Sequence, residues 1–461
     1  MVNSSSRTDS AQPNRAVDDL LRGRPSSQPS SQSSLGDSLS ITTTFEPLVD
    51  RIESDIIELS NLHEPDQQGW TRQVFSEPYR SSRDLVATKM RQCGLEVHID
   101  TAGNIVGVLR GSSSAAPALV TGSHTDTVTG GGRFDGIVGV IGALELVRQL
   151  RENDITLTRD LIVVDFLGEE SNDWGLSCLG SRSLAGELTP ADLERRDGQG
   201  RRLGDRYHDF GLSPSAVMST QWLRSTPLHA YVELHIEQGP LLERHDTQIG
   251  VVTAIAGIER MLATFVGRAD HAGTRPMDDR HDAMVAAARA VLSVQRIGCG
   301  ATKHGVATTT RLANRFASPN VVPGEVQMRS ELRSIDADWL SMAKQQIVAD
   351  VVDEAHREGV DVEFDWVTDN EISRTAPPIQ DIVATSAEQS GLTWRAVPSG
   401  ATHDAVHLAR LCPMGMVFVP SRAGRSHCPE EWTEFTDIAA GVQVLSRTIA
   451  ALDGADSVSS T

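Results

Sequence analysis

Four short apolar runs in this chain are each followed by a histidine or an acid. The runs are Ala118–Thr121, Leu161–Leu167, Ala230–Leu234 and Met414–Val419. Apolar runs of this length are typical of strands buried on both faces, as in a parallel or mixed sheet covered by helices. In an open α/β sheet, sites form just beyond the carboxyl ends of the strands. The sequence therefore predicts that polar residues distant in sequence converge at one edge of a sheet.

The residues that follow these runs are types that bind metal ions. His124 follows the first run, Glu169–Glu170 the second, His235 the third, and His427 lies shortly after the fourth. Imidazole and carboxylate groups are good zinc ligands. Two metal ions about 3.5–4 Å apart need a bridging group, and a carboxylate has an oxygen for each ion. We expect Asp135 to be that bridge, because the glycines before it let its loop bend tightly toward the ions.

Two adjacent carboxylates in one metal site need different roles. Glu169 and Glu170 would be crowded on one ion, so we expect one ligand and one base that takes a proton from the attacking water. Asp126, two residues after His124, is placed to support an imidazole or the ions. Taken alone, a histidine or an acidic pair is more often structural, and the chain has 14 histidines. Their joint position after apolar strands favours a two-metal hydrolytic site.

The composition limits the partners and the compartment of the chain. With 461 residues, 39% of them hydrophobic, the chain is too long for one ordinary core and favours two domains. A formal net charge of -20 disfavours nucleic acid and anionic membranes as partners. No apolar run is as long as a membrane-spanning helix, and the N-terminus has no apolar signal segment. The five cysteines are scattered, so we expect a reducing, cytoplasmic location without a disulfide framework.

The chain divides into a polar tail and two kinds of globular segment. Residues 1–44 are rich in Ser, Gln and Pro and are expected to be a disordered tail. Residues 45–250 and 369–455 hold the apolar runs and are predicted to form the catalytic domain. Helices are predicted there at Phe45–Leu62, at Ser82–Cys93, where Gly94 ends the helix, and at Ile137–Leu150.

The middle segment, residues 251–368, has a different order of elements. Its predicted helices are His281–Val294 and Ala337–Glu358, and its predicted strands are Met261–Val266, Gly305–Thr310, Val326–Leu332 and Val360–Val367. The order strand, helix, strand, strand, helix, strand is that of a small ferredoxin-like α+β sandwich. The predicted fold class is therefore α/β, with a mixed, mostly parallel sheet flanked by helices and interrupted by this smaller α+β domain.

At these residues the chain resembles the di-zinc aminoacylase and carboxypeptidase-like amidohydrolases, and most closely their hydantoinase/carbamoylase branch. That branch includes N-carbamoyl-L-amino-acid hydrolases, β-ureidopropionases and allantoate amidohydrolases. The resemblance covers most of the chain after the tail, and the string Glu233–Pro240 is highly specific to the branch. The matching segments are Gly103–Gly107, Gly122–Val128, Gly131–Gly136, Glu169–Glu170, Gly180–Arg182, Glu233–Pro240, His271–Thr274, Pro319–Asn320, Val322–Gly324 and Ser426–His427.

The resemblance implies a ligand set and a base. One metal ion would be held by His124, Asp135 and His235, and the other by Asp135, Glu170 and His427. Glu169 would be the base, and Asp126 would support the ligands. The two ions would be zinc, with manganese, cobalt or nickel as alternatives for the same ligands.

The resemblance also implies how a substrate is held. The inserted domain would form a homodimer, and its His271 would reach the partner subunit's site and stabilise the oxyanion. Asn320 and Arg333 would hold a substrate carboxylate, because the guanidinium fork matches two oxygens. Gln238 would touch the substrate or the attacking water, and His403 would have a role on the substrate side. The implied partner is a small molecule that bears a carboxylate.

The predicted activity is hydrolysis of a linear C–N bond, and the leading hypothesis is an N-carbamoyl-L-amino-acid hydrolase. The alternatives are an allantoate amidohydrolase, an aminoacylase or a dipeptidase on the same site, and a non-catalytic binding protein that keeps the fold. The chain departs from the family pattern at several positions that line or border the substrate pocket, which leaves the substrate open rather than the chemistry. These positions are Ser171, Arg275, Glu331 and Thr402.

Overall fold

The computed structural model describes residues 45–218, 226–301, 304–316 and 318–455. They form two compact units, and each is described here by itself. The smaller unit is Ala256–Ile372, and the larger unit comprises the described residues on either side of it. Sequence analysis places the insertion at residues 251–368, and the predicted tail, residues 1–44, lies outside the described residues. No described helix is long and apolar enough to cross a membrane.

The larger unit is built on a nine-stranded sheet of the order β1-β2-β4-β3-β5-β13-β6-β11, with β12 paired to β6. Its strands are β1 (Glu96–Ile99), β2 (Ile105–Leu109), β3 (Ala118–His124), β4 (Leu161–Phe166), β5 (Leu228–Ile236), β6 (Ile249–Ile255), β11 (Ser373–Arg374), β12 (Trp394–Ser399) and β13 (Met414–Val419). Strands β4, β3, β5 and β13 run parallel at the centre, and antiparallel pairs lie toward both edges. The predicted mixed, mostly parallel sheet flanked by helices is confirmed, with the parallel strands at its centre.

The central strands are apolar because they are buried along their whole length. Every residue of β3, β4 and β13 is buried, which requires apolar side chains on both faces. β3 ends at His124, and β5 ends directly after His235. His124 pairs with Phe166 at the end of β4, and His235 pairs with Phe418 near the end of β13. The carboxyl ends of the central strands therefore lie level and carry polar residues to one edge.

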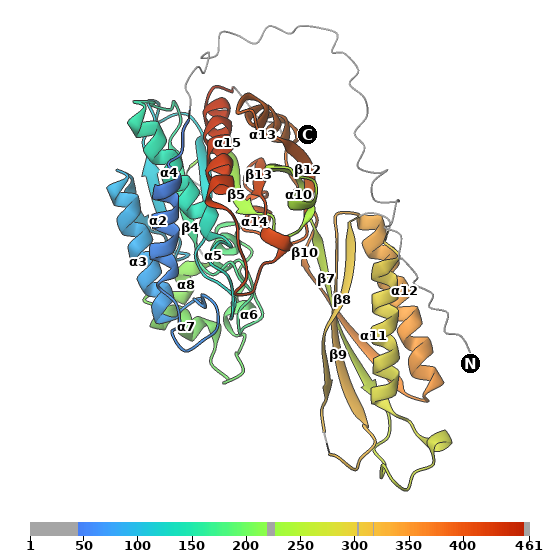
Figure 1. Ribbon diagram of the computed structural model, residues 1–461. Helices are drawn as coiled ribbons and strands as arrows, with labels where there is room; N and C mark the ends of the chain where they lie inside the picture. Colours follow the sequence, from blue (N-terminus) through green and yellow to red (C-terminus); the bar gives the residue numbers. More distant parts are fainter. Residues whose placement is uncertain (1–44, 219–225, 302–303, 317, 456–461) are drawn as a thin grey trace, which may run out of the picture. The chain divides into compact units, whose positions relative to one another are not determined.

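Helices cover the sheet (Figure 1), and one of them, α4 (Ile137–Glu152), begins two residues after Asp135. Helix α4 packs on β3 and β5 and is covered by α2 (Val49–Ser60) and α15 (Phe435–Asp453). A Cβ at Gly139 would lie 2.5 Å from the carbonyl oxygen of Leu234, so α4 approaches β5 more closely than a side chain would allow. The other helices of this unit are α3 (Glu77–Gln92), α5 (Leu179–Leu184), α6 (Pro190–Leu193), α7 (Leu203–Asp209), α8 (Pro214–Val217), α10 (Leu241–Arg244), α13 (Pro377–Gln389), α14 (Ala405–Leu408) and the 3-10 helix η2 (Arg422–Gly424).

The smaller unit is a four-stranded antiparallel sheet of the order β10-β7-β9-β8, with α11 and α12 side by side on it (Figure 1). Its elements are β7 (Gly257–Val266), η1 (Met277–Asp279), α11 (Ala283–Cys299), β8 (Gly305–Asn314), β9 (Glu325–Ser334), α12 (Ala337–Arg357) and β10 (Asp361–Asn370). The buried side of α11 is mostly alanine and packs with that of α12 and with the sheet to form the unit's own core. The buried residues of α12 are Trp339, Ala343, Ile347, Val351 and Ala355. The predicted ferredoxin-like order of elements is confirmed.

Several predicted boundaries differ from the structure for local reasons. The second helix begins at Glu77 rather than at Ser82, because Ser76 accepts the backbone N–H of Tyr79 and Pro78 fits the first turn. It ends at Gln92, and Gly94 follows with a φ of 82°, as predicted for a glycine that ends a helix. The first predicted helix is shorter at both ends and spans Val49–Ser60.

Candidate metal centre

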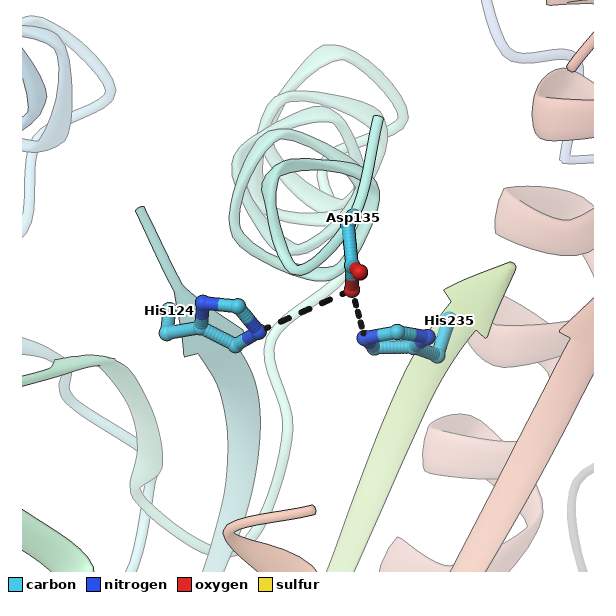
Figure 2. Close-up of side chains that lie close together, drawn as sticks. All are labelled: His124, Asp135 and His235. Carbon is cyan, nitrogen blue, oxygen red and sulfur yellow. Dashed lines mark ion pairs between the residues drawn. The ribbon is translucent and has the colours of Figure 1, made fainter. Parts of the chain in front are cut away.

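Asp135 lies between the imidazoles of His124 and His235 (Figure 2). Its Oδ1 is 3.1 Å from Nε2 of His235 and 3.9 Å from Nε2 of His124. His124 ends β3, His235 lies on β5, and Asp135 stands on the loop just before α4, so three separate elements position the group. All three side chains are buried.

The other oxygen of Asp135 faces a second group of potential ligands. Its Oδ2 is 3.0 Å from Nε2 of His427, and His427 Nε2 is 3.4 Å from Oε1 of Glu170. Glu170 follows β4, and His427 lies in the loop after β13. Each carboxylate oxygen of Asp135 therefore faces a different set of side chains. The structure thus brings together both triplets of the implied ligand set, each with ligand atoms within 4.8 Å of one another.

The distances and the hydrogen bonds of the imidazoles fit bound cations. His124 Nδ1 lies 3.1 Å from the carbonyl oxygen of Asp126, and His235 Nδ1 lies 2.9 Å from that of Ile236. A carbonyl only accepts, so each Nδ1 carries a proton, and Nε2 is the nitrogen that each ring turns toward Asp135. A cation bound between these Nε2 atoms and the carboxylate of Asp135 would have a ligand atom on either side. Two ligand atoms bound to one zinc ion at about 2.1 Å lie about 3.4 Å apart in tetrahedral geometry, close to the separations found here.

The carboxylate of Asp126 fixes the backbone of Glu169 and Glu170 by accepting a hydrogen bond from each of them. Its Oδ1 accepts the N–H of Glu169, and its Oδ2 accepts the N–H of Glu170, both at 3.1 Å. The same carboxylate lies 3.5 Å from Nδ1 of His124. One buried aspartate therefore fixes the turn that follows β4 and contacts a potential ligand on β3. This is the supporting position that sequence analysis assigns to Asp126.

Glu169 lies beside the candidate ligands but outside both triplets. Its Oε2 is 3.5 Å from Nε2 of His124, and the buried thiol of Cys178 donates to its Oε1 at 3.6 Å. The backbone N–H of Cys178 also donates to the carbonyl of Glu169. If cations were bound by the two triplets, this carboxylate would lie beside them without being one of their ligands, which is the position of a group that moves a proton.

The site concentrates negative charge in a buried volume. Burial raises the pKa of Glu169, and the neighbouring charge of Glu170 raises it further. Burial likewise raises the pKa of Glu170 to about 7. For His427, burial alone would lower the pKa, but the charges of Glu170 and Asp135 raise it to about 10. Burial and mutual repulsion make it costly for these carboxyl groups to be ionised together. Divalent cations bound between them would offset that cost with positive charge.

A third group of possible ligands does not compete with these two. Glu233, His235 and His403 also lie close together. Glu233 already accepts the hydroxyls of Ser123 and Tyr231. His235 has its Nδ1 on a carbonyl and its Nε2 toward Asp135, so it has no nitrogen left for a further cation.

Two residues of the site have a left-handed backbone that favours glycine. Gln238 and His427 both have a φ of 56°. Such conformations cost energy and cluster where function needs them. The strained turn brings Nε2 of Gln238 to 2.6 Å from Oδ2 of Asp135 and 3.4 Å from Nε2 of His427. The structure therefore places Gln238 on the candidate bridging carboxylate, and its contact with a substrate remains a prediction.

His403 is buried against one of the candidate ligands. Its ring packs edge-on against that of His235, with the centroids 4.5 Å apart, and its Nε2 lies 2.8 Å from Oγ of Ser399. Its side chain is 1% exposed, so a role on the substrate side depends on contacts made from within the site. That role remains a prediction.

The remaining predicted residues lie on the smaller unit. His271 and Asn320 are on adjacent loops, because the N–H of Ala272 donates to the carbonyl of Asn320 and His271 forms a bridge with Val321. Arg333 lies on β9, where its Nε donates to Glu331 at 2.9 Å. The structure therefore groups His271 with Asn320, and it explains one departure from the family pattern, since Glu331 still pairs with Arg333.

Sequence reasoning missed Glu431 and assigned no role to Ser426. Glu431 is 2% exposed and accepts the backbone N–H groups of Phe134 and Asp135. The Ser426 hydroxyl lies within hydrogen-bond distance of both Glu431 and Asp135. Their closeness in sequence to His427 is the only signal of these roles, because the contacts join segments about 300 residues apart.

Comparisons with known proteins find relatives over most of the chain. Residues 120–451 match the model of the family described as Peptidase family M20/M25/M40. An N-carbamoyl-L-amino-acid amidohydrolase from Paenarthrobacter aurescens is 37% identical over 88% of this chain and 98% of the relative. An allantoate amidohydrolase from Bacillus subtilis is 32% identical over 82% of this chain and 91% of the relative. The crystal structure of an amidase of the hydantoinase/carbamoylase family from Burkholderia multivorans matches with a TM-score of 0.79 and 32% identity, over 89% of this chain and 99% of that chain.

Proposed function

This chain belongs to the peptidase family M20/M25/M40, and we propose that it removes the carbamoyl group from N-carbamoyl-L-amino acids. The resemblance to the hydantoinase/carbamoylase branch is confirmed, and the predicted hydrolase of C–N bonds follows from it. The substrate class is our inference from the relatives, of which one at 37% identity is an N-carbamoyl-L-amino-acid amidohydrolase.

One observation carries the proposal: the two oxygens of Asp135 face separate imidazole nitrogens, with those of His235 and His124 at 3.1 and 3.9 Å from Oδ1 and that of His427 at 3.0 Å from Oδ2. We assign His124 and His235 to one divalent cation and Glu170 and His427 to the other, with Asp135 between them. Zinc suits these ligands, and manganese, cobalt or nickel are the alternatives.

The proposed chemistry divides the remaining roles between side chains. When bound, two divalent cations lower the pKa of a water molecule and polarise the scissile carbonyl. Glu169 takes a proton from the attacking water and delivers it to the leaving nitrogen. Attack on the ureido carbon breaks its bond to the amino-acid nitrogen and releases the amino acid and carbamate. The carbamate then decomposes by loss of its own C–N bond, so one carbamoyl substrate and one water yield an amino acid, carbon dioxide and ammonia.

We assign recognition of the substrate carboxylate to Arg333 and Asn320, and stabilisation of the oxyanion to His271. A guanidinium presents two parallel donors to the two oxygens of a carboxylate. Arg333→Ala should therefore raise KM for carbamoyl amino acids and leave a neutral ureido amide almost unaffected. Equal losses on both substrates would contradict the carboxylate role.

The test of the proposed substrate is a panel assay with the metal-loaded protein. The panel contains N-carbamoyl-amino acids, allantoate, N-acetyl-amino acids and dipeptides, and both ammonia and free amine are measured. A carbamoyl amino acid yields one ammonia and one amino acid, whereas an acetyl amino acid or a dipeptide yields amine without ammonia. Turnover confined to acetyl amino acids or dipeptides would contradict the proposal.

Two alternatives are separated by the same panel. Allantoate amidohydrolase activity is the second candidate, because an allantoate amidohydrolase is among the relatives at 32% identity. Turnover of allantoate without turnover of carbamoyl amino acids would favour it. A non-catalytic binding protein would show no turnover on any substrate with zinc, manganese or cobalt supplied.

We further propose a cytoplasmic homodimer joined through the smaller unit. On that unit, the side chain of Leu292 on α11 is 64% exposed, and β8 is an edge strand with Val306 46% exposed. Apolar side chains on an open sheet edge and a neighbouring helix are typical of an association surface. The five cysteines are scattered along the sequence, which suits a reducing compartment. Leu292→Glu should shift the molar mass in light scattering from two chains to one, and an unchanged mass would contradict this interface.

A further inference from the structure

The buried carboxylate of Glu431 connects the two loops that carry Asp135 and His427. It lies in the loop after β13, and its Oε1 accepts the backbone N–H of Phe134 at 2.9 Å and that of Asp135 at 3.1 Å. Its Oε2 accepts the Ser426 hydroxyl at 2.7 Å. Ser426 directly precedes His427 and lies 3.0 Å from Oδ2 of Asp135. A single side chain therefore holds the backbone of one candidate ligand and the neighbour of another.

The glycine-rich loop before Asp135 is shaped to admit this carboxylate. A Cβ at Gly132 would lie 2.1 Å from Oε1 of Glu431 and 2.5 Å from its Cβ. The second distance involves an atom close to the backbone, so Glu431 could not move aside by rotating its far end. Gly132 therefore leaves room for Glu431. The absence of a side chain at this glycine is needed for packing as well as for bending the loop.

From these contacts we propose that Glu431 is a positioning residue that sets the distance between Asp135 and His427. A cation shared between these ligands is bound tightly only if both are held in place before it arrives. Glu431 does this through neutral backbone and hydroxyl donors, and it stands outside both ligand triplets. The inference rests on the proposed function for the identity of the ligands, but its test measures metal binding directly.

Three substitutions at Glu431 separate positioning from charge. Glu431→Gln keeps one oxygen for the two N–H groups and places an amide that can donate to Ser426. Glu431→Asp keeps the charge but is too short to reach both loops. We expect Gln to bind metal within about threefold of the wild type, and Asp and Ala to bind about 10–100-fold more weakly. Glu430→Ala is the matched control, since Glu430 is exposed and pairs only with Arg425 among the described residues.

The measurement is titration of the metal-free protein with zinc against a chelator of known affinity, together with metal content after dialysis. Circular dichroism of the metal-free variants tests whether each is folded, and Gly132→Ala provides a second route to the same displacement if Glu431→Ala does not fold. A Gln variant that loses as much affinity as Ala would show that charge matters rather than positioning. Wild-type affinity in the Asp, Ala and Gly132→Ala variants would overturn the inference. Normal metal binding by the wild type with no turnover on the panel would contradict the proposed function alone.

Discussion

Gly136 leaves the space that the imidazole of His124 occupies. A Cβ at Gly136 would lie 2.4 Å from both Nε2 and Cε1 of that ring, and the backbone φ of Gly136 is 69°. Gly136 also donates its N–H to Nε2 of His235 at 3.2 Å. The residue after the candidate bridging carboxylate therefore contacts both imidazoles of the first triplet, and only glycine fits there.

We predict that Gly136→Ala lowers metal affinity by displacing the His124 ring. The left-handed backbone adds about 1–2 kcal/mol of strain for a residue with a Cβ. The measurement is zinc affinity by competition titration, with thermal unfolding of the metal-free protein recorded in parallel. Gly198→Ala is the control, because nothing lies within 4 Å of a Cβ there and its φ is ordinary. Wild-type affinity in Gly136→Ala would contradict the assignment of His124 as a ligand.

Glu169→Gln should lower turnover sharply while both metal ions stay bound. Glu169 lies outside both triplets, so its loss removes the proton carrier and leaves the ligands in place. A general base contributes about 10²–10⁴-fold to the rate, and kcat should fall by that factor. The paired measurement is metal content, and Glu170→Gln should show the opposite pattern of weakened metal binding. Loss of metal from Glu169→Gln would mean that a ligand has been assigned as the base.

Asp126→Asn should lower kcat/KM because it replaces one of the two carboxylate oxygens that accept backbone N–H groups with an NH₂ group. Both carboxylate oxygens of Asp126 accept backbone N–H groups, from Glu169 and Glu170, and an amide has a single oxygen. One buried N–H would then face the NH₂ group, at a cost of about 1–3 kcal/mol. We expect a loss of about 5–150-fold in kcat/KM, measured beside Asp173→Asn, a change at an exposed position in the same loop. Equal activity of the two variants would show that the turn after β4 holds its shape without Asp126.

The candidate ligands could be picked out from the sequence because their signal is local. His124 and His235 each follow a run of residues that must be apolar to fill a buried strand, so the change to a polar residue marks the strand end. The edge strand β1 carries no such signal, since most of Glu96–Ile99 is exposed and needs no apolar run. Glu431 could not be predicted either, because its role depends on a loop that lies 297 residues away.

The smaller unit shows a different limit of sequence reasoning. Its element order is local and was predictable from the periodicity of α11 and α12 and the strands between them. The surroundings of Arg333 depend on strand register instead. Arg260 on β7 lies opposite Glu331 on β9, and this pairing places Glu331 between Arg260 and Arg333. Register is set by the whole sheet, so no short segment predicts it.

The stability of the fold should depend on pH through a histidine far from the metal centre. His229 lies at the start of β5 with its side chain 7% exposed, and burial together with the nearby charge of Arg159 lowers its pKa below the ordinary value of 6.5. Below pH 6.5 this histidine is therefore protonated in the unfolded chain but still neutral in the folded protein. Because the unfolded state binds more protons, the free energy of unfolding falls as the pH falls. The contribution is at most about 1.4 kcal/mol per pH unit.

We expect His229→Gln to lose less stability than the wild type between pH 7 and 5.5, measured by urea unfolding of the metal-free proteins. Comparing two proteins that differ at one position cancels the titration of the acids at the metal centre. A difference between the two proteins that does not change with pH would contradict a neutral, buried His229.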